Sequence, residues 1–452
     1  MGGTQMNTRN RKRVWLSGIG CSMLVPLALA GCSKSDSAAD SSAKDTPKKD
    51  APAATQPVKQ PDPVTVRIHI SDAYGDDAFF KEIFADTVKA KYPYITLERV
   101  KPVSGETAEK LAAASDIPDL LVEGVGLTNY RADLKLASDL TELAKKHKFD
   151  WGQFKPVVLD AHKSLDGKQI LGMPWNGNLN ALYYNKDIFD KFGVPYPKDG
   201  MFWNDVMELA KKVSRVEGGT AYYGYDIDSL HRISFPLSLT VIDIKTNKAS
   251  INTDQWRKVF QLGKDIYSIA GNNPPTPSGG TSRFMKDRNQ AMVGTINLLY
   301  RLIGDEGKGI NWDVVQYPSY PERPNIFGRV DVHNLQISQT SKHKDEAFLA
   351  ATVIASQDVQ TKLVRKHARY SPLNDPDKKL MSQFADDVPE LKSKNVKSIF
   401  KSDYAPFNIN HRLESTAFNI AIAKFNDMVK GKDINTALRE AEEEINKMPL
   451  TQ

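Results

Sequence analysis

The stretch that decides the fold is GMPWNGNLNALYYNKDIFDKFGVPYPKDG, residues 172–200, which gathers Trp, Tyr, Pro and Asn side chains in one short segment. Taken alone, Asn176-Gly177 between apolar residues is typical of a two-residue hairpin turn. A catalytic loop and a crossing between two lobes beside a ligand are the other interpretations. The sequence on either side favours the crossing.

Strands and helices alternate at the start of the folded part of the chain. Residues 64–70 (VTVRIHI), 95–100 (ITLERV) and 118–124 (PDLLVEG) predict strands, and residues 78–93 place apolar side chains on one helical face. A β-α-β-α-β order predicts a largely parallel, doubly wound α/β sheet that binds ligands at the carboxyl ends of its strands. We therefore expect ligand contacts in residues 71–77 and 123–129.

The N-terminus has the pattern of a secretory signal over residues 1–31. Basic residues at positions 9–13 precede an apolar run at 14–30, which ends in Leu-Ala-Gly-Cys at 29–32. This tetrapeptide resembles a bacterial lipobox and predicts a diacylglycerol on Cys32; an uncleaved anchor helix is the alternative. The segment that follows, within residues 32–63, is rich in Ser, Ala, Lys, Asp and Pro and predicts a flexible tether. We expect lipid anchoring at the extracytoplasmic face of the cell membrane.

Composition excludes several classes of function. The formal net charge is +6, four of the positive charges lie in residues 1–31, and the remaining +2 gives no reason to expect nucleic acid as a partner. The two Cys lie at positions 21 and 32, so the mature fold has no disulfide and no thiolate metal site. HExxH, GxSxG, P-loop and dinucleotide-binding motifs are absent, and the His residues are scattered. We expect no catalytic residue, no cofactor and no metal.

Three segments together resemble extracellular solute-binding protein family 1 of bacterial ABC importers, the group that includes maltose-binding protein. They are residues 172–213, 284–297 (FMKDRNQAMVGTIN) and 337–364 (ISQTSKHKDEAFLAATVIASQDVQTKLV). The resemblance extends over essentially the whole mature chain. It implies a two-lobed periplasmic-binding-protein type II fold with hinge-connected, doubly wound lobes. Lobe 1 would comprise residues 64–175 and 328–369, and lobe 2 residues 176–327 and 370–452.

The resemblance also implies a function. The protein would capture a mono- or oligosaccharide in the cleft between its lobes, as a monomer without enzymatic activity, and deliver it to the permease subunits of an ABC transporter. The same fold could instead bind a polyamine, a polyol phosphate or a peptide. A surface glycoside hydrolase that uses paired carboxylates is a more remote alternative.

Binding a sugar requires aromatic rings for its C–H faces and hydrogen-bonding side chains for its hydroxyl groups. The resemblance and the predicted strand ends select side chains of both kinds. For Asp76 a helix-capping role is the alternative, for Tyr300 a place in the core, and for Arg329 an ion pair with Asp331. The predicted ligand-binding residues are Asp72, Tyr74, Asp76, Glu123, Trp175, Asn178, Tyr300, Arg329, Asp331 and His411.

Two departures from the family pattern concern local structure. Phe202 stands where the family has a Thr before the helix that starts at Trp203, so the usual N-cap is absent or supplied by Asn204. Leu298-Leu299-Tyr300 stands where the maltose-binding pattern has a stacking Trp. The identity of the sugar is therefore left open.

Overall fold

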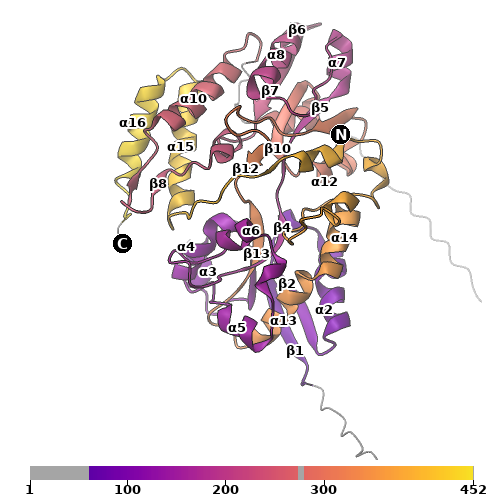
Figure 1. Ribbon diagram of the computed structural model, residues 1–452, viewed down its shortest axis with the longest axis vertical. Coiled ribbons are helices and arrows are strands. Elements are labelled where there is room, and N and C mark those ends of the chain that lie inside the picture. Colours follow the sequence, from indigo (N-terminus) through magenta and orange to yellow (C-terminus); the bar gives the residue numbers. More distant parts are fainter. Residues whose placement is uncertain (1–60, 273–278, 451–452) are drawn as a thin grey trace, which may run out of the picture. The chain divides into compact units, whose positions relative to one another are not determined.

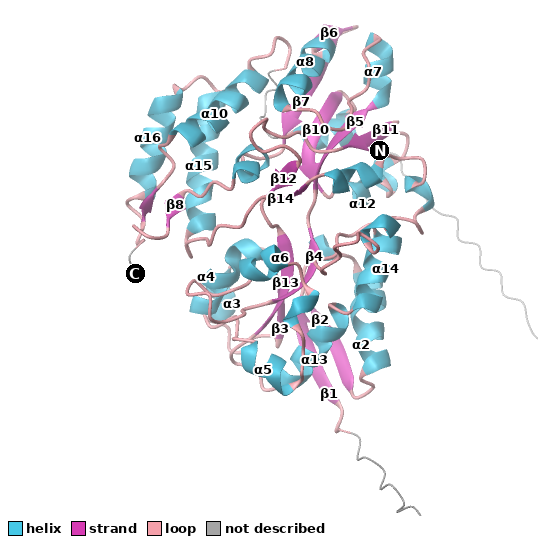
Figure 2. Cartoon of the chain, in the orientation of Figure 1, coloured by secondary structure: helices cyan, strands magenta, loops and turns pink. Residues whose placement is uncertain are grey.

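A computed structural model describes residues 61–272 and 279–450 of the chain. The predicted signal sequence, Cys32 and all but the last residues of the tether lie outside these ranges. The described residues belong to one unit, Gln60–Gln452, which contains two five-stranded sheets, each flanked by helices (Figure 1; Figure 2). The fold is the two-lobed, mixed α/β fold that the sequence predicts.

The first sheet has the strand order β2-β1-β3-β13-β4. β1 is parallel to β2 and β3, as the β-α-β-α-β pattern predicts, whereas β13 is antiparallel to β3 and β4. A strand from late in the chain is thus inserted beside the early ones. The strands are β1 (Val64–His69), β2 (Ile95–Val100), β3 (Leu120–Gly124), β4 (Met173–Gly177) and β13 (Val332–Ile337).

Helices from both halves of the sequence pack on the first sheet. The predicted helix over residues 78–93 is one continuous helical segment in which a π-helical turn, Phe80–Ala85, joins α1 to α2, and it ends before Pro93. α13 packs against α2 and β1. The helices of this region are α1 (Asp77–Phe79), α2 (Asp86–Lys91), α3 (Ala108–Ala112), α4 (Thr128–Asp133), α5 (Thr141–Lys146), α6 (Pro156–Ala161), α13 (Lys344–Ile354) and α14 (Gln357–His367).

The second sheet has the strand order β11-β5-β10-β7-β6. β7 and β10 are parallel neighbours, and β5 is antiparallel to both β10 and β11. The carboxyl ends of β7 and β10 therefore lie side by side at the same end of the sheet. The strands are β5 (Asn180–Asn185), β6 (Arg215–Glu217), β7 (Thr220–Ile227), β10 (Gln290–Ile296) and β11 (Trp312–Val315), with short pairs β8 (Ile242–Asp243) and β9 (Lys248–Ala249), and β12 (Ile326–Gly328) and β14 (Asp403–Tyr404).

Some of the helices beside the second sheet begin at a capping side chain. Thr253 accepts the backbone N–H of Trp256 and caps α10. For α8 the N-cap residue, Phe202, makes no side-chain cap, as one of the two expected alternatives has it, and Asp205, in place of Asn204, accepts the Phe202 N–H at 2.8 Å. The helices are α7 (Lys186–Phe192), α8 (Trp203–Val213), α9 (His231–Ser234), α10 (Asp254–Tyr267), α11 (Gly280–Ser282), α12 (Leu299–Leu302), α15 (Glu414–Val429) and α16 (Ile434–Ile445).

The Trp-containing stretch is not a hairpin, because β4 and β5 belong to different sheets. Asn176 and Gly177 are the last residues of β4, and only Asn178 and Leu179 lie between the two strands. Gly177 donates its N–H to the Tyr370 carbonyl oxygen at 3.1 Å. The chain therefore passes directly from one sheet to the other at this point.

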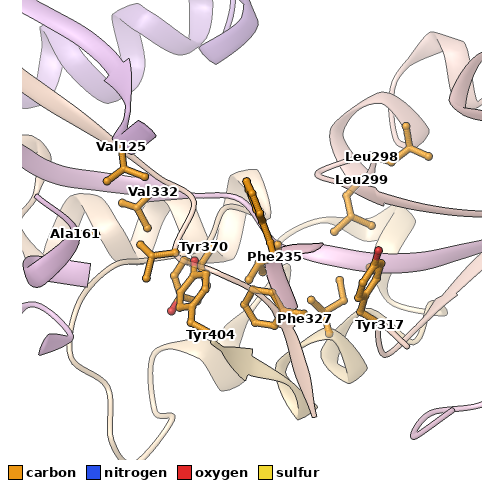
Figure 3. Close-up of a cluster of buried hydrophobic side chains, with 14 of the residues drawn as sticks. Val125, Ala161, Phe235, Leu298, Leu299, Tyr317, Phe327, Val332, Tyr370 and Tyr404 are labelled. Atoms are coloured by element: carbon orange, nitrogen blue, oxygen red, sulfur yellow. The ribbon is translucent and has the colours of Figure 1, made fainter. Parts of the chain in front are cut away.

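Aromatic side chains pack tightly around this passage. The rings of Tyr370 and Tyr404 lie edge to face with centroids 5.5 Å apart, and Phe327 lies 4.8 Å from Tyr404 (Figure 3). A Cβ added at Gly177 would lie 2.5 Å from Cδ1 of Tyr370. Only glycine fits between these rings without displacing them.

Replacing Gly177 by Ala is expected to lower the free energy of unfolding by about 1–3 kcal/mol, because the added methyl group overpacks the passage. Urea denaturation measures this change. Gly124→Ala is the matched control, since Gly124 has φ −76° and a Cβ there meets nothing within 4 Å. Equal losses in the two variants would contradict the steric argument.

Stability is also expected to depend on pH through His162, which is fully buried and bonds the Val158 carbonyl oxygen through Nδ1 at 2.7 Å. Burial lowers the pKa of His162 to about 4. Because the unfolded chain binds this proton near its ordinary pKa of about 6.5, stability is complete above that value and is lost as pH falls toward 4.

The slope contributed by His162 is at most about 1.4 kcal/mol per pH unit between those two values. Urea denaturation from pH 7.5 to pH 4.5 measures it in the native protein and in His162→Leu. In His162→Leu the dependence of the unfolding free energy on pH should be smaller by up to about 1.4 kcal/mol per pH unit, which corresponds to one proton. An unchanged slope would show that His162 stays neutral in both states or charged in both.

Candidate functional site

Polar side chains from both sheets meet at Asp331, just before β13. The Asn178 backbone N–H donates to the Asp331 carbonyl oxygen at 2.8 Å, and Asn178 Nδ2 donates to Asp331 Oδ2 at 3.0 Å. Asn178 also contacts His333 Nε2 at 3.3 Å and accepts a hydrogen bond from the Asn297 amide. The segment that leaves the first sheet is thus bonded to the segment that returns to it. We call Asn178, Asn297, Asp331 and His333 the crossing cluster.

The first sheet contributes side chains from the ends of β1 and β3. The ring of Tyr74, in the turn after β1, lies edge to face on His333 with centroids 4.7 Å apart. Glu123, near the end of β3, forms an ion pair with Arg131 Nη1 at 2.8 Å. Burial and the negative charges of Glu123 and Asp331 raise the pKa of Tyr74, so its hydroxyl stays protonated and able to donate.

The second sheet contributes side chains from the ends of β7 and β10. Asp228 follows β7 and Asn297 follows β10, so the parallel pairing of the strands brings them to the same edge. Arg232 Nε donates to Asp228 at 2.6 Å, and the Thr295 hydroxyl donates to the other oxygen of Asp228. Sequence analysis missed Asp228 and Asn297. The alternation in TAYYGYDI, residues 220–227, was a usable signal for a strand, and the strand-end rule then applies.

Arg329 lies beside the cluster without joining it. Its guanidinium carbon is 3.6 Å from the centre of the Phe235 ring, and its Nη1 donates to Asn410 at 3.2 Å. Burial lowers the pKa of Arg329, and the nearby negative charges of Glu414 and Asp331 oppose this shift. Arg329 and Asp331 form no ion pair with each other among the described residues. The alternative of a direct pair is therefore not observed, and Arg329 instead contacts Phe235 and Asn410.

Two predicted ligand contacts lie elsewhere. Trp175 has no exposed surface and packs edge to face on Phe84 with centroids 5.0 Å apart, so it belongs to the core. His411 is buried and bonds the Leu450 carbonyl oxygen through Nε2 at 3.0 Å. The sequence places Trp175 on a crossing segment and His411 before a helix. It does not indicate whether either side chain points into the core or toward a ligand. These two expectations are corrected.

Three further predicted residues lie outside the crossing cluster. Asp72 is largely exposed and pairs with Arg99 at 2.9 Å. Asp76 accepts the Phe79 N–H at 2.8 Å and caps α1, which is the alternative role considered for it. Tyr300 is 46% exposed and not part of the core. Tyr74, Glu123, Asn178, Arg329 and Asp331 are therefore the predicted residues that the fold brings close to one another.

The cluster and its surroundings can accept and donate hydrogen bonds without carrying a large net charge. Glu123 and Asp228 are each neutralised by an arginine, and their oxygens remain acceptors. Within residues 61–272 and 279–450 no three His, Cys, Asp or Glu side chains are placed to hold a metal ion. No helix in that part of the chain is long and apolar enough to cross a membrane.

The chain belongs to the family described as bacterial extracellular solute-binding protein, whose model matches residues 83–387. A putative binding protein of Brucella abortus is 24% identical over 225 residues, which cover 48% of this chain and 53% of that protein. The chain thus spans about half the length of the curated relatives it first matches. The sn-glycerol-3-phosphate-binding periplasmic protein UgpB of Brucella abortus is 39% identical over 67 residues, 15% of each chain.

Solved structures share the fold at low sequence identity. An ABC substrate-binding protein of Listeria monocytogenes in complex with cycloalternan has a TM-score of 0.71 and 20% identity, covering 85% of this chain and 99% of that one. An ABC transporter solute-binding protein of Thermotoga lettingae bound with α-D-tagatose has a TM-score of 0.65 and 20% identity, with the same coverage. These similarities establish the two-lobed architecture.

Proposed function

We propose that this protein captures a carbohydrate between its two lobes and delivers it to the permease subunits of an ABC transporter. The observation that carries the proposal is the crossing cluster, in which carboxylate, amide and imidazole groups meet beside Tyr74. Lobe 1 would comprise residues 64–175 and 328–369, and lobe 2 residues 176–327 and 370–452. Bending at the crossings would close the lobes on the solute.

The chemistry of the cluster suits a molecule with many hydroxyl groups. Each buried hydroxyl needs a partner, because an unsatisfied one costs about 1–3 kcal/mol. Asp331 and Asn297 are only partly buried, so their polar atoms lie within reach of a solute. Tyr74 offers an aromatic face and a hydroxyl donor to the same molecule.

The family and the fold support a carrier in preference to a catalyst. The Listeria protein was solved with cycloalternan and the Thermotoga protein with α-D-tagatose, both carbohydrates. A polyamine, a polyol phosphate or a peptide in the same site is the runner-up. We propose binding without turnover by a monomer, and incubation with glycosides followed by chromatography would reveal any hydrolysis.

We further propose that a lipid on Cys32 holds the mature protein at the extracytoplasmic face of the membrane. Support comes from the lipobox-like sequence at residues 29–32 and from the family's extracellular character. The Ser-, Ala- and Pro-rich residues that follow would let the receptor reach its permease.

The central experiment is a thermal-shift screen of residues 33–452 against mono- and oligosaccharides, amino acids, polyamines and polyol phosphates. A solute that binds only the folded state stabilises it by about 2.7 kcal/mol at a hundredfold excess over Kd. We expect at least one saccharide to raise the Tm. Stabilisation by polyamines or amino acids alone would refute a carbohydrate receptor.

Asp331→Asn should weaken binding of that saccharide at least about tenfold, because a charge-assisted hydrogen bond contributes about 1.5–3 kcal/mol. Titration calorimetry measures the affinity. Asp377→Asn is the matched control, since Asp377 is exposed and pairs with Lys379 at 3.3 Å. Equal affinities in the two variants would remove Asp331 from the site.

Cys32→Ser is expected to abolish metabolic labelling by palmitate and to release the protein from the membrane fraction, because the thiol is the acceptor of the lipid. Fractionation and immunoblotting measure the distribution. Cys21→Ser, in the predicted signal, is the control and should still be labelled. Membrane attachment of Cys32→Ser would disprove the lipid anchor.

A further inference from the structure

Arg369 occupies a position between elements of both sheets. It follows α14 directly before Tyr370, whose carbonyl oxygen bonds Gly177 at the passage between sheets. Its guanidinium carbon lies 5.3 Å from the centre of the Phe79 ring, in α1, and 5.3 Å from that of Tyr300, in α12. Two aromatic rings therefore flank this cation.

The guanidinium of Arg369 has almost no polar partners. Nη2 donates one long hydrogen bond, 3.3 Å, to the Tyr74 carbonyl oxygen, and the buried Nε has no hydrogen-bond partner in the described chain. Among the described residues no carboxylate lies within ion-pair distance of it, whereas Arg131 and Arg232 each have one. Desolvation by burial lowers the pKa of Arg369, which reflects the same missing counter-charge.

A charge that is partly withdrawn from water without a counter-charge favours the binding of an opposite charge. Removing one member of a buried ion pair typically destabilises a protein by several kcal/mol because the other charge is left alone. Arg369 is only partly buried, so this cost is smaller for it, but its Nε is buried without a hydrogen-bond partner among the described residues. The two aromatic rings partly compensate the charge of Arg369 through cation–π attraction. They do not accept hydrogen bonds from the N–H groups, which lie in the plane of the guanidinium.

The position of Arg369 links it to the candidate site. Arg369, Tyr300 and Asn297 line one small cavity of about 10 Å³, and Asn297 bonds Asn178 of the crossing cluster. Because this cavity has no room for an anion, a solute would have to reach the guanidinium from its exposed side. His333 lies within electrostatic reach of both Asp331 and Arg369. Arg369 is itself partly exposed and the neighbouring Tyr300 is half exposed, which leaves an approach to the guanidinium from solvent.

We propose that Arg369 binds an anionic group, a phosphate or a carboxylate, carried by the polyhydroxylated solute. This inference rests on the proposed function and narrows its substrate class to acidic saccharides and sugar phosphates; the same site would suit the polyol phosphate that is its runner-up. The planar fork of guanidinium matches the paired oxygens of both anions, and an anion there would satisfy the free N–H groups. The hydroxyl groups of the same solute would then face Asp331, Asn178 and Tyr74.

The experiment is titration calorimetry with matched pairs of neutral and anionic solutes: glycerol and sn-glycerol 3-phosphate, glucose and glucose 6-phosphate, and glucose and glucuronate. We expect the anionic member of at least one pair to bind about tenfold or more tightly than its neutral partner. Arg369→Gln should remove that preference and leave the affinity for neutral solutes unchanged. Arg365→Gln, in the helix that precedes Arg369, is the matched control, because Arg365 pairs with Asp387 at 2.7 Å.

The outcomes separate the inference from the function on which it rests. Binding of neutral solutes as tightly as anionic ones, or an anion preference that survives Arg369→Gln, overturns the inference and leaves the carbohydrate receptor standing. Binding of no saccharide or polyol of either kind overturns both. Without solute, Arg369→Gln should keep or raise the Tm, since it removes an uncompensated charge. A large fall in Tm together with loss of neutral binding would make Arg369 a structural tie between the sheets.

Discussion

The bond between Asn178 and Asp331 is the constraint on which the arrangement of the site depends. A backbone hydrogen bond of 2.8 Å and a side-chain hydrogen bond of 3.0 Å join the segment that leaves the first sheet to the segment that returns to it. Because only Asn178 and Leu179 separate β4 from β5, this pair lies where the two sheets are joined. His333 and Asn297, which both contact the Asn178 side chain, are held in place by the same pair.

Around this bond the fold separates two kinds of charge. Glu123 and Asp228 stand at strand ends of the two sheets, and each is matched by an arginine on its own side. Such pairs offer acceptor oxygens at fixed positions while keeping net charge low, which suits hydroxyl groups. Arg369 differs, because aromatic rings and no carboxylate surround its charge. A neutral polar surface and one unmatched cation therefore lie close together.

The sequence predicts the fold well because local patterns determine it. The alternation in VTVRIHI, the Pro93 stop and the Thr253 cap each specify a strand or a helix end without distant contacts. The site depends on packing between distant segments, so it was predicted only partly. Asp228 and Asn297 were missed because the strand-end rule was applied only to the strands of the first sheet, whereas these residues follow β7 and β10 of the second. His411 was misplaced because its partner, the Leu450 carbonyl, belongs to the C-terminal end. Nothing in the sequence around Arg369 indicates that it lacks a carboxylate.

Trp175 shows how a buried residue can support the candidate site from the core. Its ring packs on Phe84 at 5.0 Å and lies 6.3 Å from Tyr74 and 6.4 Å from His333, which themselves form an edge-to-face pair. Burying a ring of about 150–250 Å² at about 25 cal/mol per Å² stabilises the fold by more than the roughly 1–3 kcal/mol that an indole N–H without an acceptor costs. That N–H has no partner in the described residues, so packing, not hydrogen bonding, explains why a Trp stands here. Trp175 thus packs beside Tyr74 and His333, while Asn178, three residues later, forms the polar contacts with Asp331 and His333.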